Sequence, residues 1–593
     1  MRKLLFTLIL GFILGAGLTS LAMVTYNNQK MARIWKRYAV DPGVVKKARV
    51  AASIDGKIDV YVASSLDRIF KDGMTLVKPV FSNAADISLA RNEHESFQVV
   101  VRADKQLLED VQLSVSDLVD PQTGQMIKQG SVSWRVVGYV PTKKPYYPVK
   151  YVGLWPDPLL PGTKTNVPPG ITQPFWVTVY APAGTAPGRY EGTVTVTARD
   201  VPAITVPVRA RVYDFDIPKA SRLKTAFDFY GHITYKQFPQ REDEPDRAYK
   251  SRLGEINDKF IITMLQYRMN PILNLDPTLN EEMANVDRYL LHGLNNFSIG
   301  KRGGTFANNW PGDQEAIDNL EGLYRTYGEM LKLNNFLNYN YIYTWDEGEI
   351  GNPQVSKITA MIHRAYPGLK NMVCYHGIWD PDERPDWGKD IDIWTFQIDN
   401  FHEGKMRKLQ ALGKEIWMYI SGPGGTGAPN LAVDFDSMDY RIVAWLCWKY
   451  DIKGFLYWCV NWWPTVDPFK NAANTRWGQN GNGLLFYPGK DGPLASLRAE
   501  VFRDGMEDYE YIQRLYDTLK YLKQNKQDEQ YKEYFEESMR LLKVDDSIVV
   551  SPTEFTRDTE HLIGRRNQIA EQIEEFRKMI QKEGPDPRGP ESQ

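Results

Sequence analysis

The sequence has few of the residues from which metal, redox and disulfide sites are built. Its 593 residues include only three cysteines and seven histidines. Cys374, Cys447 and Cys459 are too few for a disulfide framework, and no pair has CxxC spacing. The histidines form neither HExxH nor HxH, so the sequence predicts no zinc site and no cofactor. A calcium site made of carboxylates alone is left open by this pattern.

Motifs for several other chemistries are also missing. The chain contains no GxSxG motif. Its glycine-rich segment 422–427 matches neither GxxxxGK[ST] nor GxGxxG, so it predicts a loop and not a phosphate site. Basic and acidic residues number 72 and 74, which gives a formal net charge of −2. This near-neutral balance provides no field for nucleic acid, and we expect no nucleic-acid partner.

The N-terminus predicts a membrane segment. Arg2 and Lys3 precede an uncharged run over residues 4–26, which as a helix is roughly 34 Å long and spans a bilayer. We favour an uncleaved signal anchor over 1–26 and a tether over 27–50; a signal peptide cleaved near Ser20-Leu21-Ala22 is the alternative. Both place the bulk of the chain outside the cytoplasm, in the periplasm or at the cell surface, membrane-anchored or secreted.

Aromatic residues are abundant and unevenly distributed. The chain has 16 Trp, 24 Phe and 33 Tyr, and most of the tryptophans lie between Trp310 and Trp477. A large aromatic core and a cleft for sugars both require such rings, because flat apolar faces suit amphipathic ligands. The composition alone leaves both interpretations open.

Residues 51–215 have the pattern of a β-sandwich. Short runs rich in β-branched residues, such as 96–101, 175–180 and 192–197, are separated by proline and glycine. A further run over 204–212 contains Pro207, which predicts an edge position because proline has no N–H to donate.

Residues 219–493 predict a (β/α)8, TIM-like barrel, because apolar strands alternate with helical stretches. The predicted strands are Leu223–Tyr230, Pro271–Leu275, Asn296–Ile299, Phe336–Thr344, Asn371–His376, Ile391–Phe396, Glu415–Ile420 and Gly454–Val460. A helical region is predicted over 494–582 and a disordered tail over 583–593. The chain is therefore predicted to be multidomain: sandwich, barrel and C-terminal helices.

The best candidate for chemistry is the end of the fourth barrel strand. There the aromatic run 341–345 is followed by Asp346 and Glu347. Paired carboxylates at the C-terminal end of a barrel strand suit acid/base work on a glycosidic bond. A solvated loop end is the alternative, since Asp-Glu dipeptides are common.

Other polar and aromatic residues lie in or after the predicted strands and would form a rim around this pair. Each one alone also fits core packing, but together they suit a carbohydrate. The candidate substrate-binding residues are Asp228, Tyr343, Tyr375, His376, Trp394, Tyr419, Trp458, Asn461 and Trp462.

The region from Asp434 to Tyr511 resembles the C-terminal signature of glycoside hydrolase family 123-like proteins. The segments that carry the resemblance are 439–441, 445–450, 454–458, Asn461, 480–489, 496–500 and the RDGMEDYEY stretch 503–511. Upstream, 93–101 and 187–192 resemble the family's N-terminal sandwich. The resemblance covers roughly residues 50–520 and excludes the membrane segment and the last helices.

The resemblance implies a retaining, exo-acting β-N-acetylgalactosaminidase with a sandwich and a (β/α)8 barrel. Asp346 and Glu347 match the family's adjacent Asp-Glu pair after the fourth strand. By that likeness, Asp346 would orient the substrate's 2-acetamido group as its oxygen attacks the anomeric carbon. Glu347 would protonate the leaving oxygen and then activate water. The substrate thus takes the place of an enzyme nucleophile.

Two departures from the family pattern bear on loops. Gly348 follows the pair where the family often has proline, and Asn482 replaces the aspartate of an NGDG motif. The charges of the segment 503–511 are interpreted as structural, tying the first C-terminal helix to the base of the barrel.

The predicted function is therefore release of a terminal β-linked N-acetylhexosamine, with N-acetylgalactosamine favoured. A non-catalytic glycan-binding envelope protein and a glycosidase for a sugar without the acetamido group are the alternatives. The expected partners are a glycan or glycoconjugate substrate and, if the N-terminal segment is uncleaved, the membrane; the oligomeric state is left open.

Overall fold

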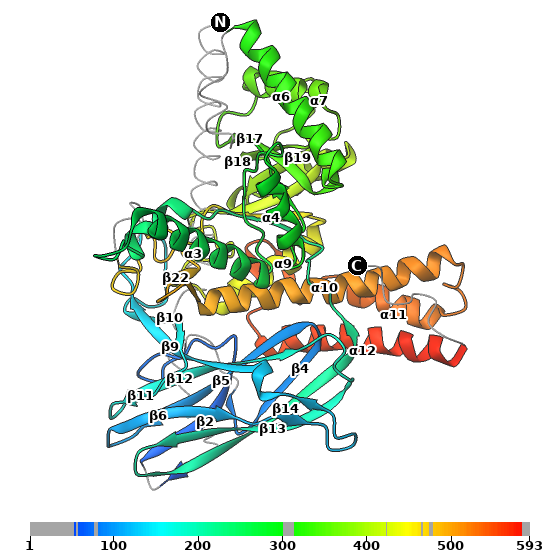
Figure 1. Ribbon diagram of the computed structural model, residues 1–593. Helices are drawn as coiled ribbons and strands as arrows, with labels where there is room; N and C mark the ends of the chain where they lie inside the picture. Colours follow the sequence, from blue (N-terminus) through cyan, green and yellow to red (C-terminus); the bar gives the residue numbers. More distant parts are fainter. Residues whose placement is uncertain are drawn as a thin grey trace, which may run out of the picture.

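The computed structural model describes residues 52–54, 57–75, 81–300, 313–422, 424–463, 467–473 and 478–583 (Figure 1). The predicted anchor over 1–26, the tether over 27–50 and the tail after residue 583 lie outside these ranges. Within them, no helix combines the length and the apolar character needed to cross a membrane.

The N-terminal third is rich in sheet, as predicted for 51–215. One sheet has the order β1-β2-β5-β12-β9-β10 with β3 beside β2, and the other has the order β11-β6-β13-β14-β4 with β7 and β8 beside it. The first consists of β1 (Ala52–Ile54), β2 (Ile58–Ser64), β3 (Phe81–Ser82), β5 (Glu93–Ala103), β9 (Val132–Pro141), β10 (Leu154–Pro161) and β12 (Thr172–Ala181). The second consists of β4 (Ala85–Arg91), β6 (Leu108–Val115), β7 (Leu118–Val119), β8 (Met126–Ile127), β11 (Thr165–Val167), β13 (Gly188–Ala198) and β14 (Val201–Asp216).

Alternation of side chains gives these sheets a common core. Val99 and Val177, from the first sheet, are buried in the same hydrophobic cluster as Val194 and Val206 from the second. The predicted edge position of Pro207 is wrong for β14 as a whole, which lies between β13 and β4. Pairing with β4 begins only at Val208, so the missing N–H of Pro207 interrupts no ladder on that side.

A nearly closed parallel barrel follows. Its seven strands have the order β15-β21-β20-β19-β18-β17-β16. They are β15 (Lys224–Phe227), β16 (Phe297–Ser298), β17 (Asn340–Asp346), β18 (Asn371–Tyr375), β19 (Ile393–Gln397), β20 (Glu415–Ile420) and β21 (Gly454–Tyr457). All of the strand pairs in this sheet are parallel, as in a TIM-like fold.

The second predicted strand, Pro271–Leu275, is reduced to single bridges that close the gap between β15 and β16. Phe227 bridges Pro271 on one side, and Leu275 bridges Ile299 on the other. Pro271 has no N–H, and Asn274 has a φ of +51°, so a continuous ladder does not form here. The fourth predicted strand starts later than expected, because 337–339 form a 3₁₀ turn.

Helices cover the outside of the barrel at the predicted places. They are α2 (Thr234–Gln237), α3 (Asp246–Gln266), α4 (Asn280–Leu290), α6 (Gln314–Leu333), α7 (Pro353–Ala365), α8 (Glu403–Ala411) and α9 (Ser437–Tyr450). Their starts follow ordinary capping rules: Asp313 accepts from the Ala316 amide, and Asn352 precedes Pro353 and accepts from the Gln354 amide.

One histidine of this outer layer predicts a pH-dependent stability. His363 on α7 lies 2.9 Å from Asp392 and 3.5 Å from Asp390. The hydrogen bond to Asp392, with the charge of Asp390, raises the pKa of His363 despite its partial burial. A raised pKa means that this stabilisation is complete below the unfolded value of about 6.5 and is lost as the pH rises through the folded value. We expect His363→Gln to lower the Tm more at pH 5.5 than at pH 8.5, measured by calorimetry; equal losses at both pH values would contradict this.

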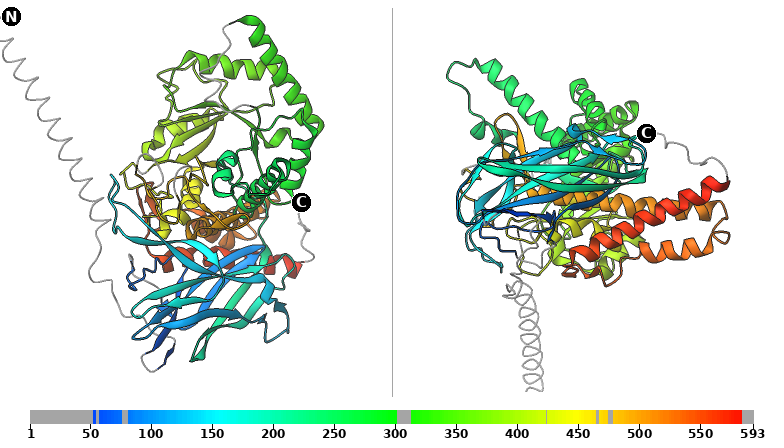
Figure 2. Two further views of the ribbon diagram at one scale, coloured as in Figure 1. Left: turned by 60° about the vertical axis from the view of Figure 1, so that its left-hand side comes forward. Right: turned by 90° about the horizontal axis from the view of Figure 1, so that it is seen from below.

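The C-terminal part is helical, as predicted, and is placed between barrel and sheets. It contains α10 (Leu497–Gln524), α11 (Lys532–Leu542) and α12 (Thr559–Glu583), with short hairpins β22 (Phe486–Pro488)–β23 (Pro493–Ala495) and β24 (Val549–Ser551)–β25 (Glu554–Phe555). The views in Figures 1 and 2 show α10 and α12 running between the barrel and the sheet-rich region. The predicted helical region 494–582 is interrupted by the β24–β25 hairpin, which occupies 549–555.

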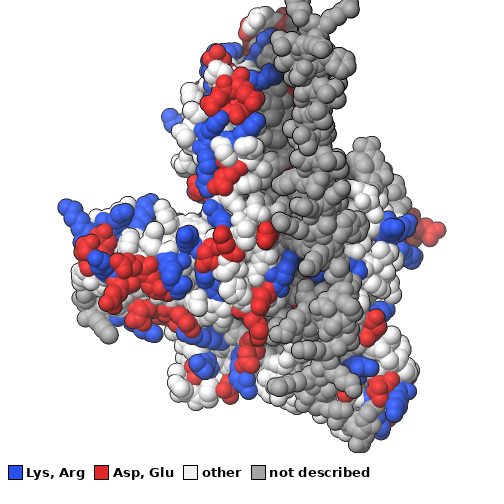
Figure 3. Space-filling view, turned by 180° about the vertical axis from the view of Figure 1, so that it is seen from behind, with Lys and Arg blue, Asp and Glu red and all other residues white. Residues whose placement is uncertain are grey.

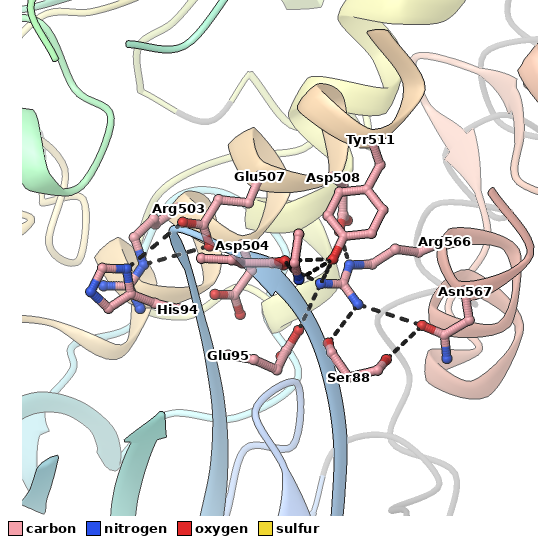
Figure 4. A network of polar contacts seen from close by, with 12 residues as sticks. Ser88, His94, Glu95, Arg503, Asp504, Glu507, Asp508, Tyr511, Arg566 and Asn567 are labelled. Atoms are coloured by element: carbon pink, nitrogen blue, oxygen red, sulfur yellow. Dashed lines mark hydrogen bonds and ion pairs between the residues drawn. The ribbon is translucent and has the colours of Figure 1, made fainter. Parts of the chain in front are cut away.

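The charged stretch of α10 connects three parts of the fold, not only the barrel base (Figure 4). Asp508 accepts two hydrogen bonds of 2.8 Å from Arg441 of α9 and lies 3.0 Å from Nε of Arg566 on α12. Arg566 and Tyr511 in turn bond Glu93 of β5. The prediction that these charges tie α10 to the barrel base is therefore incomplete, since the sheet-rich region also supplies acidic partners.

Close helix packing makes this network compact. A Cβ at Gly505 would lie 2.5 Å from the carbonyl oxygen of Arg441, so glycine allows α10 to approach α9. Burial raises the pKa of Asp504, and the neighbouring Glu95 raises it further. Burial also acts to raise the pKa of Glu507, but His94 and the guanidinium of Arg268 bring it down to about 2.

Surface charge is mixed on the face shown in Figure 3. Lys and Arg lie among Asp and Glu over the coloured part of that face, and neither sign forms a continuous field. This agrees with the formal net charge of −2.

Candidate active site

Asp346 and Glu347 lie at the C-terminal end of β17 and both contact the barrel interior. The Tyr343 hydroxyl donates to Asp346 Oδ1 at 2.8 Å, and the Tyr419 hydroxyl donates to Glu347 Oε1 at 2.8 Å. Both tyrosines belong to a buried cluster made only of residues from the barrel wall, with none from the helices. The two carboxylates therefore face the same end of the barrel, although successive strand residues normally point to opposite sides.

The backbone turn at Glu347 explains this common direction. Glu347 has a φ of +38°, a left-handed conformation that is rare for a residue with a side chain. Its N–H donates to the carbonyl of Cys374 at 2.9 Å, which holds the turn against β18. Such strained backbone at a strand end is typical of functional sites.

Gly348 completes the turn, and its environment accounts for the departure from the family pattern. A Cβ at Gly348 would lie 2.4 Å from Nε1 of Trp345. The indole of Trp345 thus packs beneath the residue that follows the pair, where the proline often found in the family would collide with it. The sequence contained the glycine but no sign of this contact.

Residues from three neighbouring strands surround Glu347. His376 Nε2 lies 3.6 Å from Glu347 Oε2, and His376 Nδ1 lies 3.0 Å from both the Tyr419 hydroxyl and Gln397 Oε1. The side chains of His376 and Glu347 are 60% and 43% exposed, so the carboxyl group is open to solvent and ligand. A solvent-accessible carboxyl group beside a fixed second one is suited to proton transfer.

Tyr419 stays protonated in this setting. Burial raises the pKa of Tyr419 far above its ordinary value, and the charges of Glu347 and Asp346 add to the effect. Its hydroxyl therefore remains a hydrogen-bond donor and fixes one oxygen of Glu347.

An aromatic rim follows β15 and β21, which lie at the other end of the strand order from β17. The ring of Trp462 is 5.7 Å from Tyr230 and 5.4 Å from Trp458, centroid to centroid. Trp458 Nε1 donates to Asn482 Oδ1 at 2.8 Å. Asn482 stands where the family motif has aspartate, and its amide oxygen serves as the acceptor. Trp458 and Trp462 thus follow β21, which corresponds to the eighth predicted strand.

Asn461 and Asp228 are buried beneath this rim. Asn461 is fully buried and exchanges two hydrogen bonds, of 3.0 and 3.1 Å, with the backbone of Tyr230. Its side chain therefore positions Tyr230 and is closed to solvent, whereas the sequence predicted a substrate contact for it. Asp228 is 4% exposed, and its backbone joins β21 to the segment at Val460.

Tyr375 and Trp394 also differ from the prediction. Both are 1% exposed and stack on each other at 5.0 Å. With Trp379 and Trp387 they form an aromatic group on the helix side of the wall. Because side chains alternate along a strand, Cys374 points into the barrel and Tyr375 points out. The structure places both rings in the core.

Over the described ranges, no group of three or more His, Cys, Asp or Glu side chains is arranged to hold a metal ion.

A solved structure has a similar architecture. A family 123 glycoside hydrolase from Clostridium perfringens, studied for glycolipid glycan hydrolysis, is similar with a TM-score of 0.65 and 13% identity, covering 88% of this chain and 99% of that one. A family 39 glycoside hydrolase from Bacteroides cellulosilyticus is matched with a TM-score of 0.33 and 9% identity, over 72% and 82% of the two chains. No curated protein matches the sequence.

Family models identify both halves of the fold. The glycoside hydrolase 123 N-terminal domain matches residues 77–198, and the glycoside hydrolase 123 catalytic domain matches residues 308–515. Together they cover more than half of the chain, and the catalytic match includes Asp346 and Glu347. The chain belongs to glycoside hydrolase family 123.

Proposed function

We propose that this protein is a retaining exo-glycosidase that releases a terminal β-linked N-acetylhexosamine, with N-acetylgalactosamine favoured. Family membership supports a glycosidase. The observation that carries the finer proposal is the pair Asp346 and Glu347, turned toward one end of the barrel and each fixed by its own tyrosine.

The reaction follows from the two roles. The carbonyl oxygen of the 2-acetamido group attacks the anomeric carbon, the glycosidic C–O bond breaks, and Glu347 gives its proton to the leaving oxygen. Asp346 accepts the acetamido N–H and stabilises the positive charge of the cyclic intermediate. Water then attacks the anomeric carbon from the opposite face and gives a proton to Glu347, which restores the acetamido group and the original configuration.

The unequal environments of the two carboxylates support this division. Glu347 is 43% exposed and can exchange protons with a leaving group or with water. Asp346 is less exposed and is held at Oδ1 by Tyr343, which suits a group that keeps one position beside the substrate.

The direct test is a panel of aryl β-glycosides of N-acetylgalactosamine, N-acetylglucosamine, galactose and glucose with the full-length chain. Cleavage of acetamido sugars alone supports the proposal. Efficient cleavage of plain galactoside would instead favour a glycosidase that does not use the acetamido group. No turnover of any sugar would favour a glycan-binding role, for which the rim of Tyr230, Trp458 and Trp462 would suffice.

Tyr419→Phe tests the support of Glu347. The variant keeps the ring in the barrel and removes one hydrogen bond to a charged group, so we expect kcat/KM to fall roughly tenfold. The Tm should change little, because the rest of the side chain is retained. Steady-state kinetics beside calorimetry check both; unchanged kcat/KM would show that Tyr419 does not support the acid/base group.

The cellular location belongs to the same proposal. The uncharged run over 4–26 supports an extracytoplasmic enzyme held at the membrane by an uncleaved anchor. Fractionation of cells and N-terminal sequencing of the mature protein test both parts.

A further inference from the structure

A loop of the sheet-rich region extends onto the barrel. Residues 142–153 connect β9 to β10, and these strands reach the barrel in Figure 2. Several polar contacts fix the loop to the barrel. The backbone of Lys143 exchanges hydrogen bonds of 3.0 and 2.8 Å with the amide of Asn480. The hydroxyl of Tyr147 donates to Asp434 at 2.9 Å, and Lys150 forms a largely buried ion pair with Asp436 at 2.9 Å.

Tyr146 lies between these anchors and presents its ring to solvent. It is 65% exposed, whereas its neighbour Tyr147 is 4% exposed. The Tyr146 hydroxyl accepts a hydrogen bond of 2.7 Å from Gln479, and its ring packs edge-on against Tyr147 at 5.3 Å. An exposed aromatic ring that is held at its hydroxyl and along one edge loses little entropy when a ligand stacks on it.

The loop reaches the C-terminal edge of the barrel, where the proposed active site lies. Tyr147 and Pro148 line a small cavity together with Asp399, which follows β19, and with the glycine-rich loop that follows β20. The loop thus crosses the ends of these two strands.

A chain of polar contacts leads from Tyr146 to the aromatic rim. Gln479 accepts from Asn482, and Asn482 accepts from Trp458, whose ring packs on Trp462. Two buried side chains, Gln479 and Asn482, thus connect the exposed ring of Tyr146 to Trp458 of the aromatic rim.

We propose that Tyr146 forms a binding subsite for the sugar on the leaving-group side of the scissile bond. The inference rests on the proposed function: an exo-acting enzyme holds the terminal sugar over Asp346 and Glu347, so the rest of the substrate extends outward across the rim. An aromatic ring stacks on the apolar face of a sugar. The substrate class is then an oligosaccharide or glycoconjugate with at least one further sugar next to the one released, and the sheet-rich region is part of its recognition.

The test compares two substrates in the full-length chain. One is a trisaccharide ending in β-linked N-acetylgalactosamine; the other is methyl β-N-acetylgalactosaminide, whose leaving group is too small to reach the rim. We expect Tyr146→Ala to lower kcat/KM for the trisaccharide roughly tenfold and to change kcat/KM for the methyl glycoside less than about twofold. Tyr146→Phe, which keeps the ring and loses only the hydroxyl, should retain most of the activity on the trisaccharide.

The matched control is Tyr516→Ala. Tyr516 is also an exposed tyrosine, at 47%, but it lies on α10 against Trp448, away from the loops after the strands. It should leave both substrates unaffected. An equal effect of Tyr146→Ala on the two substrates, or no effect on either, overturns the subsite while leaving the proposed function intact. Turnover of neither substrate by the wild-type protein overturns the proposed function, and the subsite with it.

Discussion

Replacing Glu347 by Gln is expected to lower kcat by about 10²- to 10⁴-fold, the usual contribution of a general acid/base. The amide cannot deliver a proton to the leaving oxygen or remove one from water. It can still accept the hydrogen bond from Tyr419, so the local geometry should persist. The loss should be largest for poor leaving groups such as alkyl or sugar oxygens, and smaller for nitrophenolate, which departs without protonation. Steady-state kinetics on both leaving-group types measure this difference.

Two further variants make the Glu347 result specific. Asp346→Asn should lower kcat for all leaving groups alike, because it removes the charge that stabilises the cyclic intermediate in both steps. Glu349→Gln is the matched control: it is an exposed carboxylate two residues further along, and it should leave kcat unchanged. A Glu347→Gln enzyme with near wild-type activity on alkyl glycosides would assign the proton transfer to another group.

Replacing Asp508 by Asn is expected to destabilise the folded protein by about 3–5 kcal/mol, the range for breaking a buried ion pair on one side. Asp508 is fully buried, accepts from Arg441 and from Trp445 Nε1 at 3.0 Å, and lies beside Arg566. Asparagine has the same shape, but its amide removes the charge and turns a donor toward a guanidinium. Two arginines with no access to water then lose their shared counter-charge.

Calorimetry of wild type and variant measures this effect as a fall in Tm. Because α10 links α9, α12 and β5, the fall should involve the barrel and the sheet-rich region together, as one transition or two shifted ones. The control is Glu109→Gln, which removes one partner of an exposed pair with Arg199. An exposed pair is worth about 0–1 kcal/mol, so its Tm should hardly change. If the Tm of Asp508→Asn falls no more than that of Glu109→Gln, the other carboxylates of the cluster compensate for the lost charge.

Sequence patterns predicted the order of the parts and most of the barrel because those properties are local. Apolar runs, caps and turns are encoded within a few residues, and the predicted strand Glu415–Ile420 coincides with β20. The second strand was predicted to be more regular than it is. The effect of Pro271 and Asn274 on the strand ladder depends on how the adjacent strands approach, which the sequence does not show.

For the candidate site, the sequence was informative about residue type and strand end but not about direction. It predicted Asp346 and Glu347 at the end of a barrel strand, with Tyr343, His376, Tyr419, Trp458 and Trp462 around them. It did not predict that Tyr375 and Trp394 point outward, or that the side chain of Asn461 hydrogen-bonds the backbone of Tyr230. Which residues of a strand face the barrel interior is decided by packing against the helices. The sequence of a single strand does not contain this information.

The sequence by itself thus determined the family and the succession of sheets, barrel and helices. It also determined the position of the acidic pair at the end of a barrel strand. Only the tertiary structure decided which buried charges meet and what stands at the rim. Asp508 meets Arg441 across 67 positions of the chain, and Tyr146 meets Gln479 across 333. Such contacts depend on how three separate parts dock, and docking is governed by complementary surfaces and burial of charge, which leave no periodic pattern in the sequence.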